Sequence, residues 1–183
     1  MKCHVIVEGA ADGEMFTRLF ADFPLSERPR VVVAGGKSRC VSVARSILAI
    51  KREPVVVVVD ADSSDPDTLA EQRAYLEFEM RAVSTPAAWK VFLMQPELES
   101  LLFSVSHAIE RYFEVQLTPE QKVRAEYSPK TVLAGLDKQP WSVIELVQSL
   151  TEEELKQIRD RDEISEIRAF ISSAAGTSSM ARA

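Results

Sequence analysis

The run VVVVV at residues 55–59 constrains the fold of this chain more than any other feature. A run of β-branched residues favours an extended strand, and because side chains alternate along a strand, both faces of this one are apolar. Both faces must then be buried, which is typical of a central strand in a parallel sheet with helices on both sides. The run therefore predicts an α/β fold.

The segments around this run alternate between extended and helical patterns. Strands are expected at 3–7, 30–34, 55–59 and 89–94, and helices at 13–23, 38–50, 67–81 and from Glu97 to about Ser106. Strands that alternate with helices predict a mainly parallel sheet of about four strands, flanked by helices. The carboxyl ends of such strands share one edge of the sheet, where open α/β folds carry their sites.

The pattern changes after Glu114. Thr118 with Gln121, and Thr151 with Glu154, have the spacing of capping boxes, so they predict the starts of two short helices. The last residues are small and polar, as in tails without regular structure. We therefore expect three parts, which are an α/β core at 1–114, a helical extension packed on the core at 115–172, and a disordered tail at 173–183.

Charge and composition limit the class of protein. The net charge of −6 argues against a protein that coats nucleic acid by charge alone, but it allows an enzyme that binds nucleic acid through a bound cation. No apolar run reaches the roughly 18 residues that a membrane span needs, and the N-terminal segment resembles a strand rather than a secretory signal. We expect a cytoplasmic protein that does not contact membranes.

Two carboxylates directly follow the valine run, in the sequence DAD at 60–62. If the extended geometry continues past Val59, Asp60 and Asp62 face one point, where like charges about 4 Å apart repel by about 4 kcal/mol at a surface-like dielectric. A divalent cation turns that repulsion into chelation, and hard oxygen ligands suit Mg²⁺ or Mn²⁺. The alternative is a polar turn before the next helix, which explains Asp65 and Asp67 better than the DAD pair.

A third acidic residue, Glu8, closes the first expected strand. Gly9 then allows a tight turn into the next helix, for which Asp12 is the expected N-cap. Glu8 lies at the same predicted sheet edge as Asp60 and Asp62, and the three carboxylates together predict a metal site. Taken alone, Glu8 is better explained as an exposed polar loop residue.

A glycine pair and two basic residues stand at the same predicted edge, in the sequence GGKSRC at 35–40. Backbone amides at the start of a helix can receive a phosphate, and basic side chains beside them would support it. The spacing is not that of a Walker A motif, and a tight turn with a solvated lysine is the alternative. The candidate phosphate-binding residues are Gly9, Gly36, Lys37 and Arg39.

These motifs resemble those of a known family. VIVEGAADGEMF followed by VVVVVDADSSD is similar to the Toprim domain, which topoisomerases, primases and OLD-family nucleases share. That family has an acidic residue and a glycine after the first strand and a DxD after the third, and Glu8, Gly9, Asp60 and Asp62 match these positions. The resemblance covers roughly residues 3–105 and is strongest to small, defence-associated Toprim proteins and OLD-type nuclease domains.

The resemblance implies further site residues. MQPELESLLF is similar to a Pro-Glu-x-Glu segment in small relatives, which makes Glu97 and Glu99 candidate ligands of a second metal ion. Acidic residues at a helix start also complement the helix dipole, which is their alternative role. OLD-type enzymes use a lysine beyond the DxD, and Lys130 is a candidate for it, although no local motif marks this lysine.

The implied activity is metal-dependent hydrolysis of phosphodiester bonds in DNA or RNA. Asp60 and Asp62 would hold Mg²⁺ or Mn²⁺, and Glu8 would act as general base on a metal-bound water or as a further ligand. Some OLD-type domains are fused to an ATPase, so the resemblance also implies an ABC-type ATPase partner and a role in antiviral defence.

Two other interpretations stay open. One is a noncatalytic Toprim-like module that binds a nucleotide or metal, or that docks on a partner ATPase. The other is a receiver-type doubly wound domain with an acidic Mg²⁺ pocket. A receiver carries an acidic pair after its first strand, where this chain has the single Glu8, so this interpretation ranks lower.

Overall fold

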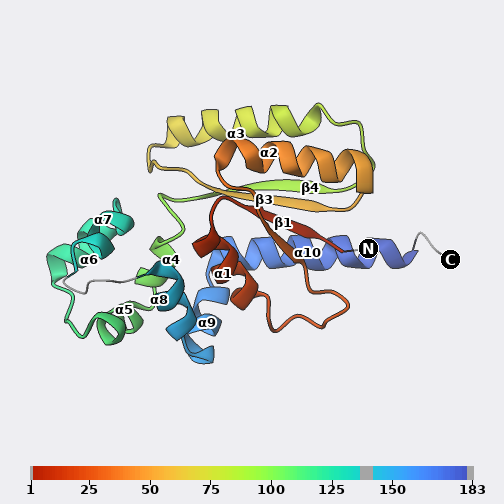
Figure 1. Cartoon of the computed structure of the whole chain (residues 1–183). Coiled ribbons are helices and arrows are strands. Elements are labelled where there is room, and N and C mark those ends of the chain that lie inside the picture. The colour runs from red at the N-terminus through yellow and green to blue at the C-terminus, as the bar shows by residue number, and fades with distance from the viewer. Residues whose placement is uncertain (1, 137–141, 181–183) are drawn as a thin grey trace.

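Four parallel strands form one sheet in a computed structural model that describes residues 2–136 and 142–180 (Figure 1). The strand order is β2-β1-β3-β4. The strands are β1 (His4–Val7), β2 (Arg30–Val33), β3 (Val55–Asp60) and β4 (Trp89–Met94). The expected α/β fold with a four-stranded parallel sheet is confirmed.

The valine run is an inner strand, because β3 pairs with β1 on one side and with β4 on the other. Its side chains alternate between two separate core clusters. Val56 and Val58 belong to one cluster, and Val55, Val57 and Val59 belong to the other. Both faces of the strand are thus buried, which is the requirement that its composition predicts.

Helices cover both faces of the sheet (Figure 1). On one face lie α2 (Lys37–Ser46), which continues into the short π-helix η1 (Ile47–Lys51), and α3 (Pro66–Arg81). On the other face lie α1 (Ala10–Leu19) and the C-terminal helix α10 (Asp162–Met180). Each layer buries its apolar residues against one of the two core clusters.

The C-terminal half is helical, as expected. Its helices before α10 are α4 (Ser100–Phe103), α5 (Ser106–Phe113), α6 (Pro119–Ala125), α7 (Pro129–Ala134), α8 (Val143–Ser149) and α9 (Glu152–Arg159). Capping boxes open α6 at Thr118 and α9 at Thr151. Helices α8 and α9 pack on α1 and share its core cluster, so this half continues the core of the sheet.

The C-terminal helix extends further than the sequence predicts. Ile164, Ile167, Ile171 and Ala174 form a buried stripe at helical spacing, and the last of these lies inside the expected tail. Helix α10 runs to Met180 and so overlaps the expected tail, whose disorder stays a prediction, and residues 181–183 lie outside the described part. The division at residue 114 stays a prediction.

Two other local details differ from expectation. Helix α1 has Gly9 as its N-cap, and Asp12 accepts a hydrogen bond from the Gly9 N–H at 2.8 Å from inside the first turn. The helix expected from Glu97 to about Ser106 is divided, because α4 ends at Phe103 and α5 begins at Ser106. No helix in the described ranges combines the length and apolar character needed to cross a membrane.

Candidate functional site

Strands β1 and β3 end side by side, and each ends at an acidic residue. Glu8 follows β1, and its Oε1 atom accepts a hydrogen bond from the backbone N–H of Asp60 at 3.0 Å, across 52 positions of sequence. The parallel pairing of β1 with β3 produces this contact, because it brings the carboxyl ends of both strands to one edge. Helices α4 and α7 lie beyond the same edge, at the left of Figure 1.

Both carboxylate oxygens of Asp60 have partners. Oδ1 accepts a hydrogen bond from the Leu98 N–H at 2.8 Å, and Oδ2 lies 2.7 Å from the Nζ atom of Lys130. The side chain is only 13% exposed. Asp60 is therefore a partly buried carboxylate whose orientation is fixed by two contacts. One comes from Leu98 in the segment after β4, and the other comes from Lys130 on α7.

Asp62 points elsewhere, because the chain leaves the extended conformation after β3. Asp62 has a φ of 53°, in the left-handed region, and its N–H donates to the Pro96 carbonyl at 2.8 Å. Its exposed carboxylate lies 2.8 Å from Lys37 Nζ. We expected Asp60 and Asp62 to face one point if the extended conformation continued past Val59. It does not continue, and the two carboxylates pair with two different lysines.

Lys130 also contacts two further acidic residues at this edge, Glu97 and Glu99. Its backbone N–H, at the start of α7, donates to Glu97 Oε2 at 3.1 Å. Its Nζ atom lies 3.6 Å from Glu99 Oε2 and 3.8 Å from Glu97 Oε1, in addition to the contact with Asp60. Burial lowers the pKa of Lys130, but the hydrogen bond to Asp60 and the three negative charges outweigh it and raise the pKa above its ordinary value.

Glu99 is the most deeply buried carboxylate of this group, with a side chain 8% exposed. Burial raises the pKa of Glu99 to about 7, although the charge of Lys130 acts in the opposite direction. Its Oε2 atom is buried and has no hydrogen-bond partner within the described residues. A buried oxygen without a hydrogen bond is costly even with the Lys130 ammonium 3.6 Å away, and a directly bound cation would remove that cost.

Glu8 also has a raised pKa, chiefly through burial and also through the charges of Asp60 and Asp62, while the Asp60 N–H and Lys37 oppose the shift. A carboxylate with a raised pKa is a better proton acceptor near neutral pH than an ordinary one. Glu8 thus combines a position at the sheet edge with a raised pKa.

Asp12 belongs to the same acidic group, which the sequence analysis did not predict. Burial raises the pKa of Asp12, the Gly9 N–H lowers it, and the charge of Asp60 raises it further. The charge of Asp12 in turn raises the pKa of Glu99. The available signal was its position on the first turn of a helix that begins at the sheet edge, three residues after Gly9 and four after Glu8.

The candidate phosphate-binding residues differ in what they offer. The Gly36 N–H donates to the Glu8 carbonyl at 3.1 Å, and the Gly9 N–H donates to Asp12, so neither amide is free to receive a phosphate in this structure. Gly36 has a φ of 129°, which a residue with a side chain rarely adopts, so its role is to turn the chain. Lys37 lies at the acidic edge, and Arg39 is exposed on the first turn of α2.

The possible metal ligands at this edge fit Mg²⁺ or Mn²⁺, because they are carboxylate oxygens. One of them, Glu99 Oε2, is buried without a hydrogen bond from any described residue. Within residues 2–136 and 142–180, however, no three His, Cys, Asp or Glu side chains are arranged to hold a metal ion. Lysine ammonium groups lie beside the carboxylates instead. A metal ion would therefore have to replace Lys130 beside Asp60.

Comparisons with known proteins support the fold. No protein-family model matches the sequence, and no curated protein matches it. The C-terminal region of the Burkholderia pseudomallei OLD protein has a similar structure, with a TM-score of 0.61 and 15% identity over 95% of this chain and 98% of that one. The corresponding region of the Xanthomonas campestris pv. campestris OLD protein gives a TM-score of 0.49, with 15% identity over 86% of this chain and 94% of that one. Over nearly its whole length, the chain is therefore similar in fold to the C-terminal region of an OLD protein.

Proposed function

We propose that this chain is a metal-dependent phosphodiesterase that hydrolyses DNA or RNA. The observation that carries the proposal is the convergence of Glu8, Asp60, Glu97 and Glu99 with Lys130 at one sheet edge. The resemblance of the EG and DAD motifs to the Toprim domain supports it. The similarity in fold to the C-terminal region of an OLD protein agrees with that resemblance.

The acidic residues would have two different roles, which are to bind the cation and to accept a proton. Asp60, Glu97 and Glu99 would hold the cation, and Asp12 adds negative charge beside them. Asp62 would have to turn from Lys37 to join them. When bound, Mg²⁺ or Mn²⁺ polarises a phosphate oxygen and lowers the pKa of a bound water. Glu8 would accept a proton at its Oε atoms, for which its raised pKa is favourable.

Lys130 would change partners during the reaction. In this structure its ammonium neutralises the carboxylate of Asp60. With a cation beside Asp60, the Lys130 ammonium would be free to contact a non-bridging oxygen of the substrate phosphate, which carries the opposite charge. Lysine is an ammonium at neutral pH unless it is deeply buried, so Lys130 would act as an electrostatic contact rather than as a base.

Cleavage of end-labelled DNA and RNA, with Mg²⁺, with Mn²⁺ and with chelator, tests this proposal. The wild-type chain should cut at least one substrate only when metal is present. Asp60→Asn and Glu8→Gln should fold and lose cleavage, whereas the control Asp65→Asn, on the exposed N-cap of α3, should cut normally. Intact substrates under all conditions, or equal cutting by the three variants, would rule out the proposed site.

A noncatalytic module that binds a nucleotide or docks on a partner is the second candidate. The observation that favours it is the lack of a ready arrangement of three metal-ligating side chains among the described residues. The cleavage assay separates the two candidates, because a binding module leaves every substrate intact.

An ABC-type ATPase is the partner that we propose for either activity, with antiviral defence as the setting. The support is the Toprim resemblance together with a structural relative that is itself the C-terminal region of an OLD protein. Co-purification with an ATPase encoded beside this chain would support the pairing. Separate elution of the two proteins during gel filtration, with and without ATP, would contradict it.

A further inference from the structure

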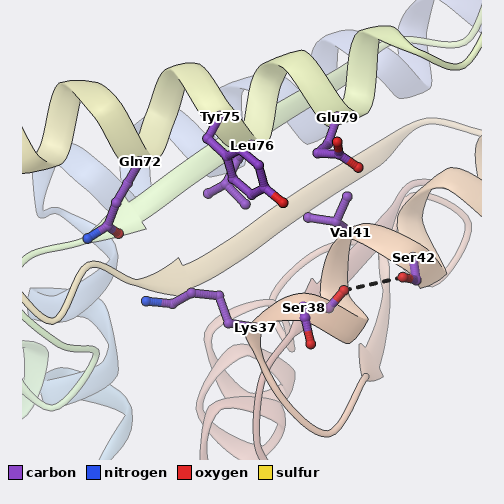
Figure 2. A pocket seen from close by; sticks show the side chains of 8 residues that line it. All are labelled: Lys37, Ser38, Val41, Ser42, Gln72, Tyr75, Leu76 and Glu79. Atoms are coloured by element: carbon purple, nitrogen blue, oxygen red, sulfur yellow. Dashed lines mark hydrogen bonds between the residues drawn. The ribbon is translucent and has the colours of Figure 1, made fainter.

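A groove between α2 and α3 lies next to the acidic edge. Its volume is about 760 Å³, and the polar side chains along it come from both helices (Figure 2). They are Lys37, Ser38, Ser42, Gln72, Tyr75 and Glu79. This volume falls in the range of small-ligand sites, roughly 300–1,000 Å³, and is large enough for a nucleotide.

One end of the groove adjoins the segment that follows β3. On the α2 side, Lys37 Nζ lies 2.8 Å from the Asp62 carboxylate. On the α3 side, the Gln72 amide donates to the Ala61 carbonyl at 2.9 Å. Both walls thus contact residues next to Asp60, and the groove continues from the proposed reaction centre onto the outer layer of helices.

An exposed aromatic ring lines the middle of the groove. Tyr75 is 65% exposed and points from α3 toward α2 (Figure 2). Of the exposed aromatic residues on α3, Tyr75 lines the groove and Phe78 does not, so the Tyr75 ring offers a ligand in the groove an apolar face. Nucleobases stack on such rings without regard to sequence, because every base has a π-face.

The charges along the groove favour an anionic ligand at the end near the centre. Glu79 is the acidic residue of the lining, and its carboxylate lies 2.8 Å from Arg45 Nη1 on α2, which neutralises it. Lys37 is the basic residue of the lining, and its ammonium pairs with the exposed Asp62 carboxylate, so it would be available to a phosphate once Asp62 holds the cation of the proposed function. A phosphate at Lys37 and a base at Tyr75 would therefore both meet complementary groups.

We propose that this groove holds a nucleotide of a single-stranded substrate, adjoining the phosphodiester that is cut, with its base stacked on Tyr75. This inference rests on the proposed function, and it names unpaired DNA or RNA as the preferred substrate. A duplex keeps its bases stacked inside the helix and cannot offer one to Tyr75 without unpairing it.

Binding of fluorescently labelled oligonucleotides, followed by anisotropy, tests the inference. The full chain would carry Asp60→Asn, so that bound strands stay uncut, and Mg²⁺ and low salt would be kept constant. The probes are single-stranded oligo-dT and oligo-U and a mixed-sequence DNA duplex. Tyr75→Ala should weaken single-strand binding about 5- to 100-fold, the loss expected for one base stacked on an aromatic ring, and should leave duplex binding unchanged.

Two variants serve as matched controls. Tyr75→Phe keeps the ring and should bind single strands within about twofold of the parent. Phe78, on the same helix, is 70% exposed but does not line the groove, so Phe78→Ala should have no effect. All of these side chains are exposed, and thermal unfolding should confirm that each variant is folded.

Equal single-strand binding by Tyr75→Ala and its parent would overturn the inference, as would equal losses in Tyr75→Ala and Phe78→Ala. Failure of the wild-type chain to cut any substrate would refute the proposed function instead. The binding comparison does not depend on cleavage, so the two failures are distinguishable.

Discussion

Lys130 Nζ lies 2.7 Å from Asp60 Oδ2, although the two residues are 70 positions apart in the chain. The contact joins α7, in the helical half, to the end of the central strand. It also explains how several carboxylates remain together at one edge, because a single ammonium group lies near Asp60, Glu97 and Glu99 at the same time.

Substitution Lys130→Met should destabilise the chain by about 1–2 kcal/mol, since it leaves partly buried carboxylates without their counter-ion. Mn²⁺ should then raise the melting temperature of the variant more than that of the wild type, because the cation no longer competes with an ammonium group. Thermal unfolding with and without Mn²⁺ measures both effects.

Lys122→Met provides the control for that comparison. Lys122 on α6 has a side chain 48% exposed, against 46% for Lys130, and it pairs with Glu110 away from the acidic edge. Its variant should respond to Mn²⁺ as the wild type does. A response to Mn²⁺ that is the same in Lys130→Met and Lys122→Met would show that Lys130 and the metal do not share a site.

Lys37 and Arg39 were both predicted to contact phosphate, and their positions separate them. Lys37 lies beside Asp62, whereas Arg39 is exposed on α2. Lys37→Met should lower kcat/KM for cleavage by about tenfold or more, the loss expected for one contact to a charged group. Arg39→Met should change it less than Lys37→Met does. Steady-state kinetics at fixed salt would show this, and the reverse order would exclude Lys37 as the phosphate contact.

Glu154 should make stability depend on acid pH. The hydrogen bond from Arg111 lowers the pKa of this carboxylate from 4.5 to about 2, against the opposing effect of burial. A lowered folded-state pKa stabilises the protein above the unfolded-state value, by about 3 kcal/mol, and that contribution is lost as the pH falls from 4.5 toward 2.

Urea unfolding of the wild type and of Glu154→Gln at pH 7 and at pH 3 measures that contribution. The stability difference between the two proteins should be large at pH 7 and should shrink markedly at pH 3. A difference that does not change with pH would show that Glu154 stabilises α9 through packing and capping rather than through its charge.

The C-terminal helix should unfold together with the sheet. Ile167 is fully buried in the core cluster that α10 shares with β1 and α1, so Ile167→Ala should cost about 2–5 kcal/mol. Glu166→Ala, at a neighbouring exposed position, should cost less than about 1 kcal/mol. Circular dichroism and tryptophan fluorescence should report one common transition, and two separate transitions would show that the helical half is an independent unit.

The fold was predictable because its strongest signal is local. Five consecutive valines require burial on both faces of a strand, and the alternation of strands with helices leaves few topologies other than a parallel sheet. The closeness of Glu8 and Asp60 follows from that topology, since both residues end parallel strands that pair directly.

The rest of the site depends on contacts that a local pattern does not encode. The left-handed conformation of Asp62 depends on its hydrogen bond to Pro96, and the position of Lys130 depends on how α7 packs beyond the sheet. The small residues after Ile171 indicated disorder, although the buried stripe of α10 continues through Ala174.

Calorimetric titration of Mn²⁺ into the metal-free chain tests the central claim most directly. We expect saturable binding to the wild type and to Asp65→Asn. That binding should be lost or weakened by at least about tenfold in Asp60→Asn and Glu97→Gln, which remove charge from the edge of the sheet. No binding to the wild type, or equal binding to all four proteins, would contradict the claim that these carboxylates form a metal site.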